Sequence, residues 1–196
     1  LLKNKQKKYL AKTSIILFII IMMIGETQNQ TDKMLLYSEG FLNYVKSVEN
    51  NQLFKTGTGM RQKSPEGGND TVGYGHKLTD EEIASGKVYG YDINNLNKNQ
   101  ANTILIRDLE EKNKILNNKL GTAYTELDPK RKQMLLDIQF NVIGGIDSFP
   151  KFTEAVLDND INTMQEEYKR YFKNKQGEYQ ELARNKSFSS FFFDTE

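Results

Sequence analysis

Carboxyl and hydroxyl groups that could do acid–base chemistry lie in two neighbouring stretches of the sequence. Glu49 follows apolar residues in "YVKSVENN", and such surroundings raise the pKa of a carboxyl and suit it to act as a general acid. The stretch "EGGNDTVGYGHKLT" then supplies Glu66, Asp70 and the hydroxyl of Thr71. Glycoside cleavage needs one protonated acid and one group that activates water or stabilises the oxocarbenium ion. The chain has 26 acidic residues, so residue types alone indicate this chemistry without selecting among them.

The second stretch also holds four of the 14 glycines and the only histidine of the chain. Glycine is favoured where the backbone needs a positive φ or a close approach to another group. Gly67 and Gly68 predict a tight hairpin that leads into a short strand over 71–75. No partner for a Ser-His triad is visible. We therefore expect His76 to be structural and to bind an acid of the helical part.

Composition and charge exclude several classes of protein. The chain of 196 residues has no Cys, which excludes disulfides, thiolate nucleophiles and Cys-type zinc sites. Its net charge of +1 hides an asymmetry, because residues 1–25 hold five Lys and no acid. The other 22 basic and 26 acidic residues give 26–196 a net charge of −4. Such a domain would not neutralise a phosphate backbone, so nucleic acid is not an expected partner.

The N-terminal 25 residues resemble a targeting segment. After the lysines comes an uninterrupted apolar run of ten residues, 15–24. A helix of that length spans about 15 Å, roughly half the hydrocarbon core of a bilayer. A basic stretch followed by a short apolar run is the pattern of a secretory signal. The cleavage site is poor, so residues 1–25 are predicted to be a signal peptide or an uncleaved signal anchor that exports the rest.

Local signals predict an α+β fold after this segment. A polar linker is expected over 26–37, and a β-rich lobe over about 51–77. Helices are predicted at 36–50, after the capping box Thr79–Glu82 and up to Gly86, from Asn97 or Asn99, from Pro129 after the N-cap Asp128, and over 150–158, 160–173 and 176–190. The helix from Pro129 is apolar on most sides and is therefore predicted to be central. A small sheet beside helices makes a cleft, which is a common place for a ligand.

The sequence over 38–190 closely resembles the bacteriophage-type lysozymes, the muramidases and endolysins of glycoside hydrolase family 24. The resemblance rests on a helix that ends in Glu, followed by "TVGYGHKLT". It continues through "LNKNQANTILIRDLEEKNKIL", "LDPKRKQMLLDIQFNVIGGIDSFPKFTEAVLDNDI" and the Arg-containing "LARNKSF". It implies a lysozyme-like catalytic domain over 38–196, with a small β-rich lobe, a larger helical lobe around a central buried helix, and the active site between them.

The resemblance also assigns roles to particular residues. The general acid of the family falls on Glu49, and its Thr falls on Thr71. The second carboxylate does not match, because 21 residues separate Glu49 from Thr71, more than the family pattern E-x8-D-x5-T allows. The expected Asp position falls on Pro65, which makes Glu66 the nearest acid. Asp70 is the alternative, although strand alternation should turn it away from the side that Thr71 faces.

The implied activity is hydrolysis of peptidoglycan at the β-1,4 bond between N-acetylmuramic acid and N-acetylglucosamine, with inversion at the anomeric carbon. Gly73 and Gly75 would keep the strand thin where the polysaccharide passes, and Tyr74 would line the cleft or pack. No metal or organic cofactor is implied. The expected protein is a monomer that faces the cell wall, either secreted, periplasmic or held at the membrane by its N-terminus.

Two other functions remain open at this point. A lytic transglycosylase on the same fold needs only one acid, and it forms a 1,6-anhydro product without water. A wall-binding homologue could have the fold without the chemistry, although the presence of both Glu49 and Thr71 argues against it.

Overall fold

The computed structural model describes residues 22–23, 26–27, 30–49, 61–62, 70–174 and 176–194, and of 61–62 only the backbone. The chain divides into two compact units, Leu1–Ser38 and Glu39–Glu196. In the first unit, residues 26–27 and 30–36 are helical. The role of 26–37 as a linker stays a prediction. Within the described ranges, no helix has the length and apolarity needed to cross a membrane.

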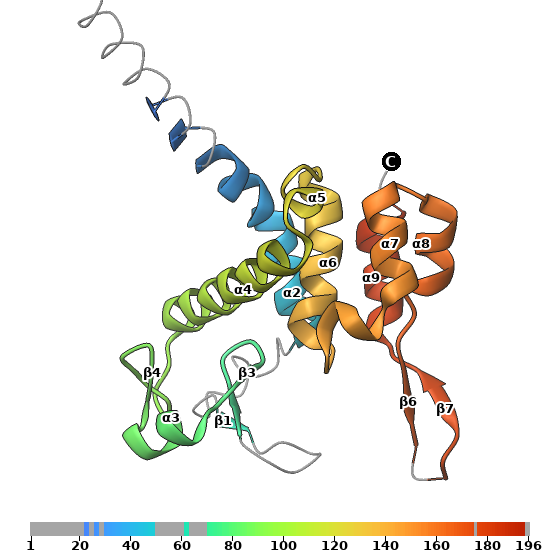
Figure 1. Cartoon of the computed structure of the whole chain (residues 1–196). Helices are drawn as coiled ribbons and strands as arrows, with labels where there is room; N and C mark the ends of the chain where they lie inside the picture. The colour runs from blue at the N-terminus through green and yellow to red at the C-terminus, as the bar shows by residue number, and fades with distance from the viewer. Residues whose placement is uncertain are drawn as a thin grey trace, which may run out of the picture. The chain divides into compact units, whose positions relative to one another are not determined.

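The second unit has a β-rich part built from short strands (Figure 1). Strands β1 (Arg61–Gln62), β2 (Thr71–Val72) and β3 (His76–Lys77) form an antiparallel sheet, and helix α3 (Asp80–Ser85) precedes a second pair, β4 (Lys87–Val88) and β5 (Tyr91–Asp92). These elements share one apolar cluster with helix α4 (Lys98–Leu120), made of Val72, Leu78, Val88, Ile93, Leu96 and Ile104. This cluster fixes the β-rich part against α4.

The predicted strand over 71–75 is wrong in its second half. Only Thr71 and Val72 are in a strand, and residues 73–75 form the turn between β2 and β3. Gly73 and Gly75 have φ of +57° and +89°, values that extended backbone does not take. The two glycines therefore reverse the chain instead of thinning a strand. The hairpin predicted at Gly67 and Gly68 lies outside the described residues.

The rest of the second unit is mainly helical. Its elements are α2 (Glu39–Glu49), α4, α5 (Thr122–Thr125), α6 (Pro129–Asn141), η1 (Gly145–Ser148), α7 (Pro150–Asp158), α8 (Ile161–Glu167) and α9 (Arg184–Phe192). The predicted helix starts are confirmed at Thr79, Asn97, Asp128 and Asp160, because each side chain caps the backbone of its own helix.

Helix α6 is the central helix of this part, as predicted. Leu135, Leu136 and Ile138 are fully buried, and Figure 1 shows α6 between α4 and the group α7 to α9. The α+β class expected from the sequence, with a central buried helix, is thus confirmed.

The two helices predicted over 160–173 and 176–190 are both partly wrong. Helix α8 ends at Glu167, and the chain then forms a hairpin of β6 (Tyr171–Lys173) and β7 (Tyr179–Glu181) before α9 begins. Asn174 makes the turn, because its Oδ1 accepts hydrogen bonds from the backbone N–H groups of Gln176 and Glu178. Gly177 has φ of +83°, which breaks a helix at this point. Asn174 and Gly177 are thus the turn residues that interrupt the expected helices.

Candidate active site

Glu49 is the last residue of α2 and lies at the wall of a pocket of about 470 Å³. Its side chain is 16% exposed. The pocket is lined by residues from four parts of the second unit: Val48 and Glu49 of α2, Gly75 of the β2–β3 turn, Phe140 and Asn141 at the end of α6, and Leu182, Ala183 and Arg184 at the start of α9. Glu49 is the only carboxylic acid among these described lining residues.

An ion-pair network holds the Glu49 carboxylate in place. Arg184 Nη1 donates to Glu49 Oε1 at 2.5 Å, and Arg184 Nη2 donates to Asp137 Oδ1 at 2.7 Å. Arg170 Nη2 binds the other oxygen of Asp137 at 2.6 Å. Asp137 lies in the middle of α6 and is fully buried. Each of the four residues comes from a different segment, so the network joins α2, α6 and the two ends of the β6–β7 hairpin.

The network separates the acidities of its two carboxyl groups. Burial raises the pKa of Glu49, and the positive charge of Arg184 offsets only part of this rise. Burial also acts to raise the pKa of Asp137, but Arg184 and Arg170 together outweigh it and hold that pKa below its usual value. Two carboxyl groups whose environments push their pKa values apart can take different roles. Asp137 stays ionised and fixes Arg184, while Glu49 is suited to hold a proton.

Sequence reasoning missed Asp137, Arg170 and the ion pair that Arg184 makes with Glu49. The segment "LARNKSF" contains Arg184, but the sequence does not indicate a partner for it. One signal was available for Asp137, since a charged residue in the middle of a helix that is apolar on most sides implies a buried partner. Which partner this would be could not be derived from the helix itself.

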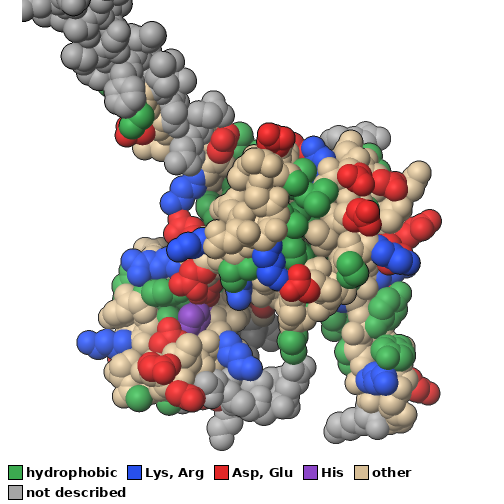
Figure 2. All heavy atoms as spheres, viewed as in Figure 1, with side chains coloured by type: hydrophobic (Ala, Val, Ile, Leu, Met, Phe, Trp, Pro, Cys, Tyr) green, Lys and Arg blue, Asp and Glu red, His purple; other side chains and the backbone are tan. Residues whose placement is uncertain are grey.

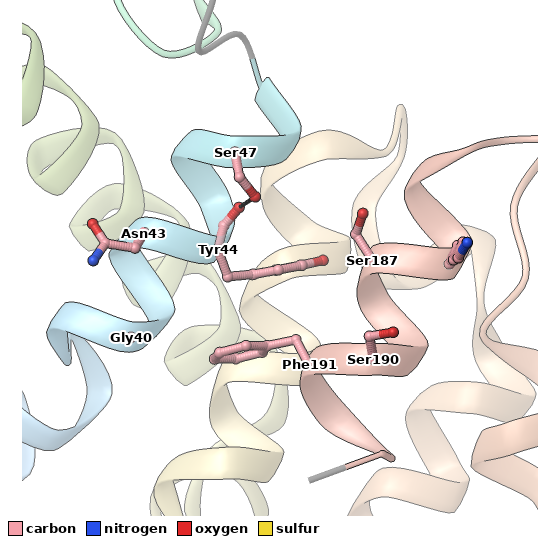
Figure 3. A pocket seen from close by; sticks show the side chains of 8 residues that line it. Gly40, Asn43, Tyr44, Ser47, Ser187, Ser190 and Phe191 are labelled. Atoms are coloured by element: carbon pink, nitrogen blue, oxygen red, sulfur yellow. Dashed lines mark hydrogen bonds between the residues drawn. The ribbon is translucent and has the colours of Figure 1, made fainter.

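The packing of α2 against α9 brings Glu49 and Arg184 together. Figure 3 shows Tyr44 of α2 beside Phe191 of α9, and their rings stack with centroids 4.7 Å apart and planes inclined by 12°. Ser47 and Ser187 lie further along the same groove, toward the ends that carry Glu49 and Arg184 (Figure 3). The stack therefore sets the spacing of the two helices at the site.

Gly75 positions the β2–β3 turn against the general-acid candidate. A Cβ atom at this residue would lie 2.6 Å from Glu49 Oε2, so a larger side chain does not fit there without moving the carboxylate. A Cβ at Gly73 would instead lie 3.5 Å from Cβ of Ala101 in α4, an ordinary contact. Ala101 thus occupies the space beside Gly73, and the Glu49 carboxylate occupies the space beside Gly75.

The other predicted site residues lie nearby or outside the described ranges. Thr71 is half-buried in β2, next to the fully buried Val72, so strand alternation turns Thr71 away from the core. Asp70 is half-buried and precedes the strand. Glu66 lies outside the described residues, and the choice between Glu66 and Asp70 stays open. Tyr74 is 2% exposed, with Lys46 Nζ 5.8 Å from its ring centre. It packs here, and a contact with substrate stays a prediction.

His76 is paired with acids, as predicted. Its Nδ1 lies 2.9 Å from Asp108 of α4, and its Nε2 lies 3.1 Å from Glu82 of α3. Burial lowers the pKa of His76, but the hydrogen bonds and charges of Asp108 and Glu82 outweigh this and raise it to about 8. The imidazolium joins β3, α3 and α4. Within the described ranges, no group of three or more His, Asp or Glu side chains could hold a metal ion.

Comparison with known proteins agrees with the lysozyme-like fold expected from the sequence. The family model for phage lysozyme matches residues 55–187, about two thirds of the chain. A solved structure, the muramidase domain of SpmX from Asticaccaulis excentricus, is 20% identical and covers 80% of this chain and 96% of its own, with a TM-score of 0.52. That likeness supports the fold. A comparison of the chain with curated protein sequences found no match.

Proposed function

The chain belongs to the phage lysozyme family, and we propose that Glu49 is the general acid with which it hydrolyses peptidoglycan. The bond cleaved would be the β-1,4 bond between N-acetylmuramic acid and N-acetylglucosamine. The observation that supports this most is the buried carboxyl of Glu49, whose pKa is raised although Arg184 binds it. A carboxyl with a raised pKa keeps its proton to a higher pH than an ordinary Glu, and it can give that proton to the leaving glycosidic oxygen.

Water would be activated or positioned by Glu66 and Thr71 on the opposite face of the sugar. Such an arrangement gives inversion of the anomeric carbon, and it requires the two carboxyl groups to be about 6.5–9.5 Å apart rather than about 5–5.5 Å. Support comes from β2, whose alternation turns Thr71 to the side away from the core. Exchange of Glu66 and Asp70 for their amides, one at a time, identifies the second carboxylate by the larger loss of turnover.

The decisive variant for the proposed acid is Glu49→Gln. It keeps the size of the side chain and a polar contact for Arg184, but it cannot donate a carboxylic proton. We expect the release of soluble fragments from purified peptidoglycan to fall about 10²–10⁴-fold, the usual contribution of general acid catalysis. Glu39→Gln, at the exposed start of the same helix, is the matched control and keeps full activity. A Glu49→Gln chain that is folded and retains most of its activity would show that Glu49 is not the acid.

A lytic transglycosylase is the second candidate, because Glu49 is the only carboxylic acid among the described lining residues of the pocket. Mass spectrometry of the released fragments separates the two reactions. Reducing muramic acid ends establish hydrolysis. Anhydro-muramic ends, lighter by one water, establish transglycosylation with Glu49 acting alone. Binding to peptidoglycan without any release of fragments would instead identify an inactive wall-binding homologue.

Export of the domain is a further part of the proposal. Residues 1–25, with five lysines and an apolar run, would carry the domain out of the cytoplasm and hold it as a monomer at the membrane beside its substrate. Residues 26–196 have a net charge of −4 and would therefore not be attracted to an anionic cell wall. Attachment of the enzyme to the membrane would replace that attraction. Replacing residues 1–25 by an efficiently cleaved signal should lower lytic potency in cells, and equal potency would refute attachment.

A further inference from the structure

The β6–β7 hairpin exposes more large apolar side chains than a solvated hairpin needs. Tyr171 is 53% exposed, Phe172 43%, Tyr179 71%, and Leu182, just after β7, 36%. Isolated exposed apolar residues are common on proteins, but a contiguous set often marks a binding surface. The hairpin projects from the helical part of the second unit (Figures 1 and 2).

The two faces of this hairpin differ in chemistry. Phe172 pairs with Gln180 across the strands, so these two side chains lie on the same face. The backbone N–H of Leu182 donates to the carbonyl of Arg170, which continues the ladder and puts Leu182 on that face as well. This face is called the inner face below. Its charged residues are Arg170, which is buried in the ion pair with Asp137, and Glu178 near the turn, whose carboxylate accepts a hydrogen bond from the Asn174 amide. The outer face carries Tyr171 and Tyr179 with charged neighbours, and Lys173 Nζ lies 5.0 Å from the Tyr179 ring centre.

Each face continues into a different pocket. Leu182 of the inner face lines the pocket that contains Glu49. Tyr171 of the outer face lines another pocket of about 460 Å³, which is bordered by Phe149 and Lys151 and contains none of the residues around Glu49. In Figure 1 the hairpin and the β1–β3 sheet project in the same direction, on opposite sides of α6. The inner face thus extends the wall of the Glu49 pocket on the side away from the sheet.

We propose that the inner face binds the peptidoglycan glycan strand beyond the bond that is cleaved, with Phe172, Gln180 and Leu182 as its contacts. This inference rests on the proposed function and adds a second part of the substrate-binding surface. From Leu182 to Gln180 the strand advances about 7 Å, which carries the surface beyond the pocket itself. The hairpin would act as the wall of the cleft opposite the β-rich part.

The chemistry of the inner face fits a neutral amino-sugar polymer. The C–H face of a pyranose ring can pack on the Phe172 ring, and the Gln180 amide can both donate to and accept from hydroxyl and N-acetyl groups. Leu182 offers an apolar surface for an N-acetyl methyl group. A few polar groups among apolar and aromatic ones are the usual lining of a ligand site. The charged outer face lacks this combination and has no link to Glu49.

The test compares Phe172→Ala with Tyr179→Ala. Both remove an exposed aromatic ring from the same hairpin, one from each face, so Tyr179→Ala is the matched control. Binding is measured with the full chain carrying Glu49→Gln, by co-sedimentation with purified peptidoglycan, so that no turnover interferes. We expect Phe172→Ala to weaken binding about fivefold, the loss that corresponds to one aromatic contact, and Tyr179→Ala to leave binding unchanged.

Kinetics on the chain with Glu49 intact give a second readout. Phe172→Ala should raise KM for polymeric peptidoglycan and leave kcat within about twofold, because a contact remote from the cleaved bond contributes to binding alone. Three outcomes would overturn the inference. Phe172→Ala could bind as well as the chain with Phe172, both alanine variants could lose the same affinity, or none of the chains could bind. Binding that depends on Phe172, together with no release of fragments by the chain with Glu49 intact, would leave the inference standing and refute the proposed hydrolysis.

Discussion

Gly75→Ala tests the contact between the β2–β3 turn and the carboxyl of Glu49, the proposed general acid. The added Cβ would lie 2.6 Å from Glu49 Oε2, where an ordinary contact needs about 3.4 Å or more. The carboxylate or the turn must therefore move by about 1 Å. A displacement of that size at a reacting group can cost about 100-fold in rate. We expect kcat for peptidoglycan to fall by about this factor.

The same substitution also strains the backbone, and this contribution has to be separated. Gly75 has φ of +89°, and an L-residue with positive φ costs about 1–2 kcal/mol. Gly90 provides the control, because its φ is +87° and nothing lies within 4 Å of the Cβ it would gain. Gly90→Ala should lose about the same free energy of unfolding and keep its activity.

The assay is the initial rate of release of reducing ends, measured alongside the urea denaturation of each variant. The reasoning requires a large difference in kcat between Gly75→Ala and Gly90→Ala at similar stability. If both variants keep kcat within a few-fold of the parent chain, either the Glu49 carboxyl does not lie against the turn or its position is not important for the rate. A loss of activity that follows the loss of stability in both variants would reduce the effect to backbone strain.

Two further predictions concern the ion pairs. Asp137→Asn leaves Arg170 buried without its acid and leaves Arg184 with Glu49 alone, so the free energy of unfolding from urea denaturation should fall by about 3–5 kcal/mol. A fall below about 1 kcal/mol would contradict a stabilising role for the ion pairs of Asp137. Asp147→Asn, which removes the exposed pair with Lys119, is the control and should have little effect. His76 contributes stability that is fully present below its ordinary pKa of 6.5 and is lost as pH rises through about 8, because the raised pKa means that the folded state holds the proton more tightly. A rise of about 1.5 units corresponds to about 2 kcal/mol, so the parent chain should lose about this much between pH 6 and 9, and His76→Gln should show no such loss.

The local elements were predictable because their signals lie within a few residues of one another. The Thr79 capping box, the Asn97 cap and Asp128 followed by Pro129 each mark a helix start in the structure. The apolar pattern after Pro129 identified the central helix, because burial on most sides needs apolar residues on most sides. The β6–β7 hairpin was overlooked, since its three-residue strands are too short for a clear alternation of apolar and polar residues.

The candidate active site also has a part that could be predicted from the sequence and a part that could not. Glu49 and Thr71 could be proposed from the sequence, because the segments that resemble the family are short and continuous. The partner of Glu49 was not, since Arg184 is 135 residues further along the chain and Asp137 lies between them. The contact of Gly75 with Glu49 could not be predicted either, because a missing Cβ does not say what fills its space. The sequence by itself determined which groups can do chemistry and where helices begin. Only the tertiary structure decided which charges share a buried site, because that depends on how α2, α6 and α9 pack.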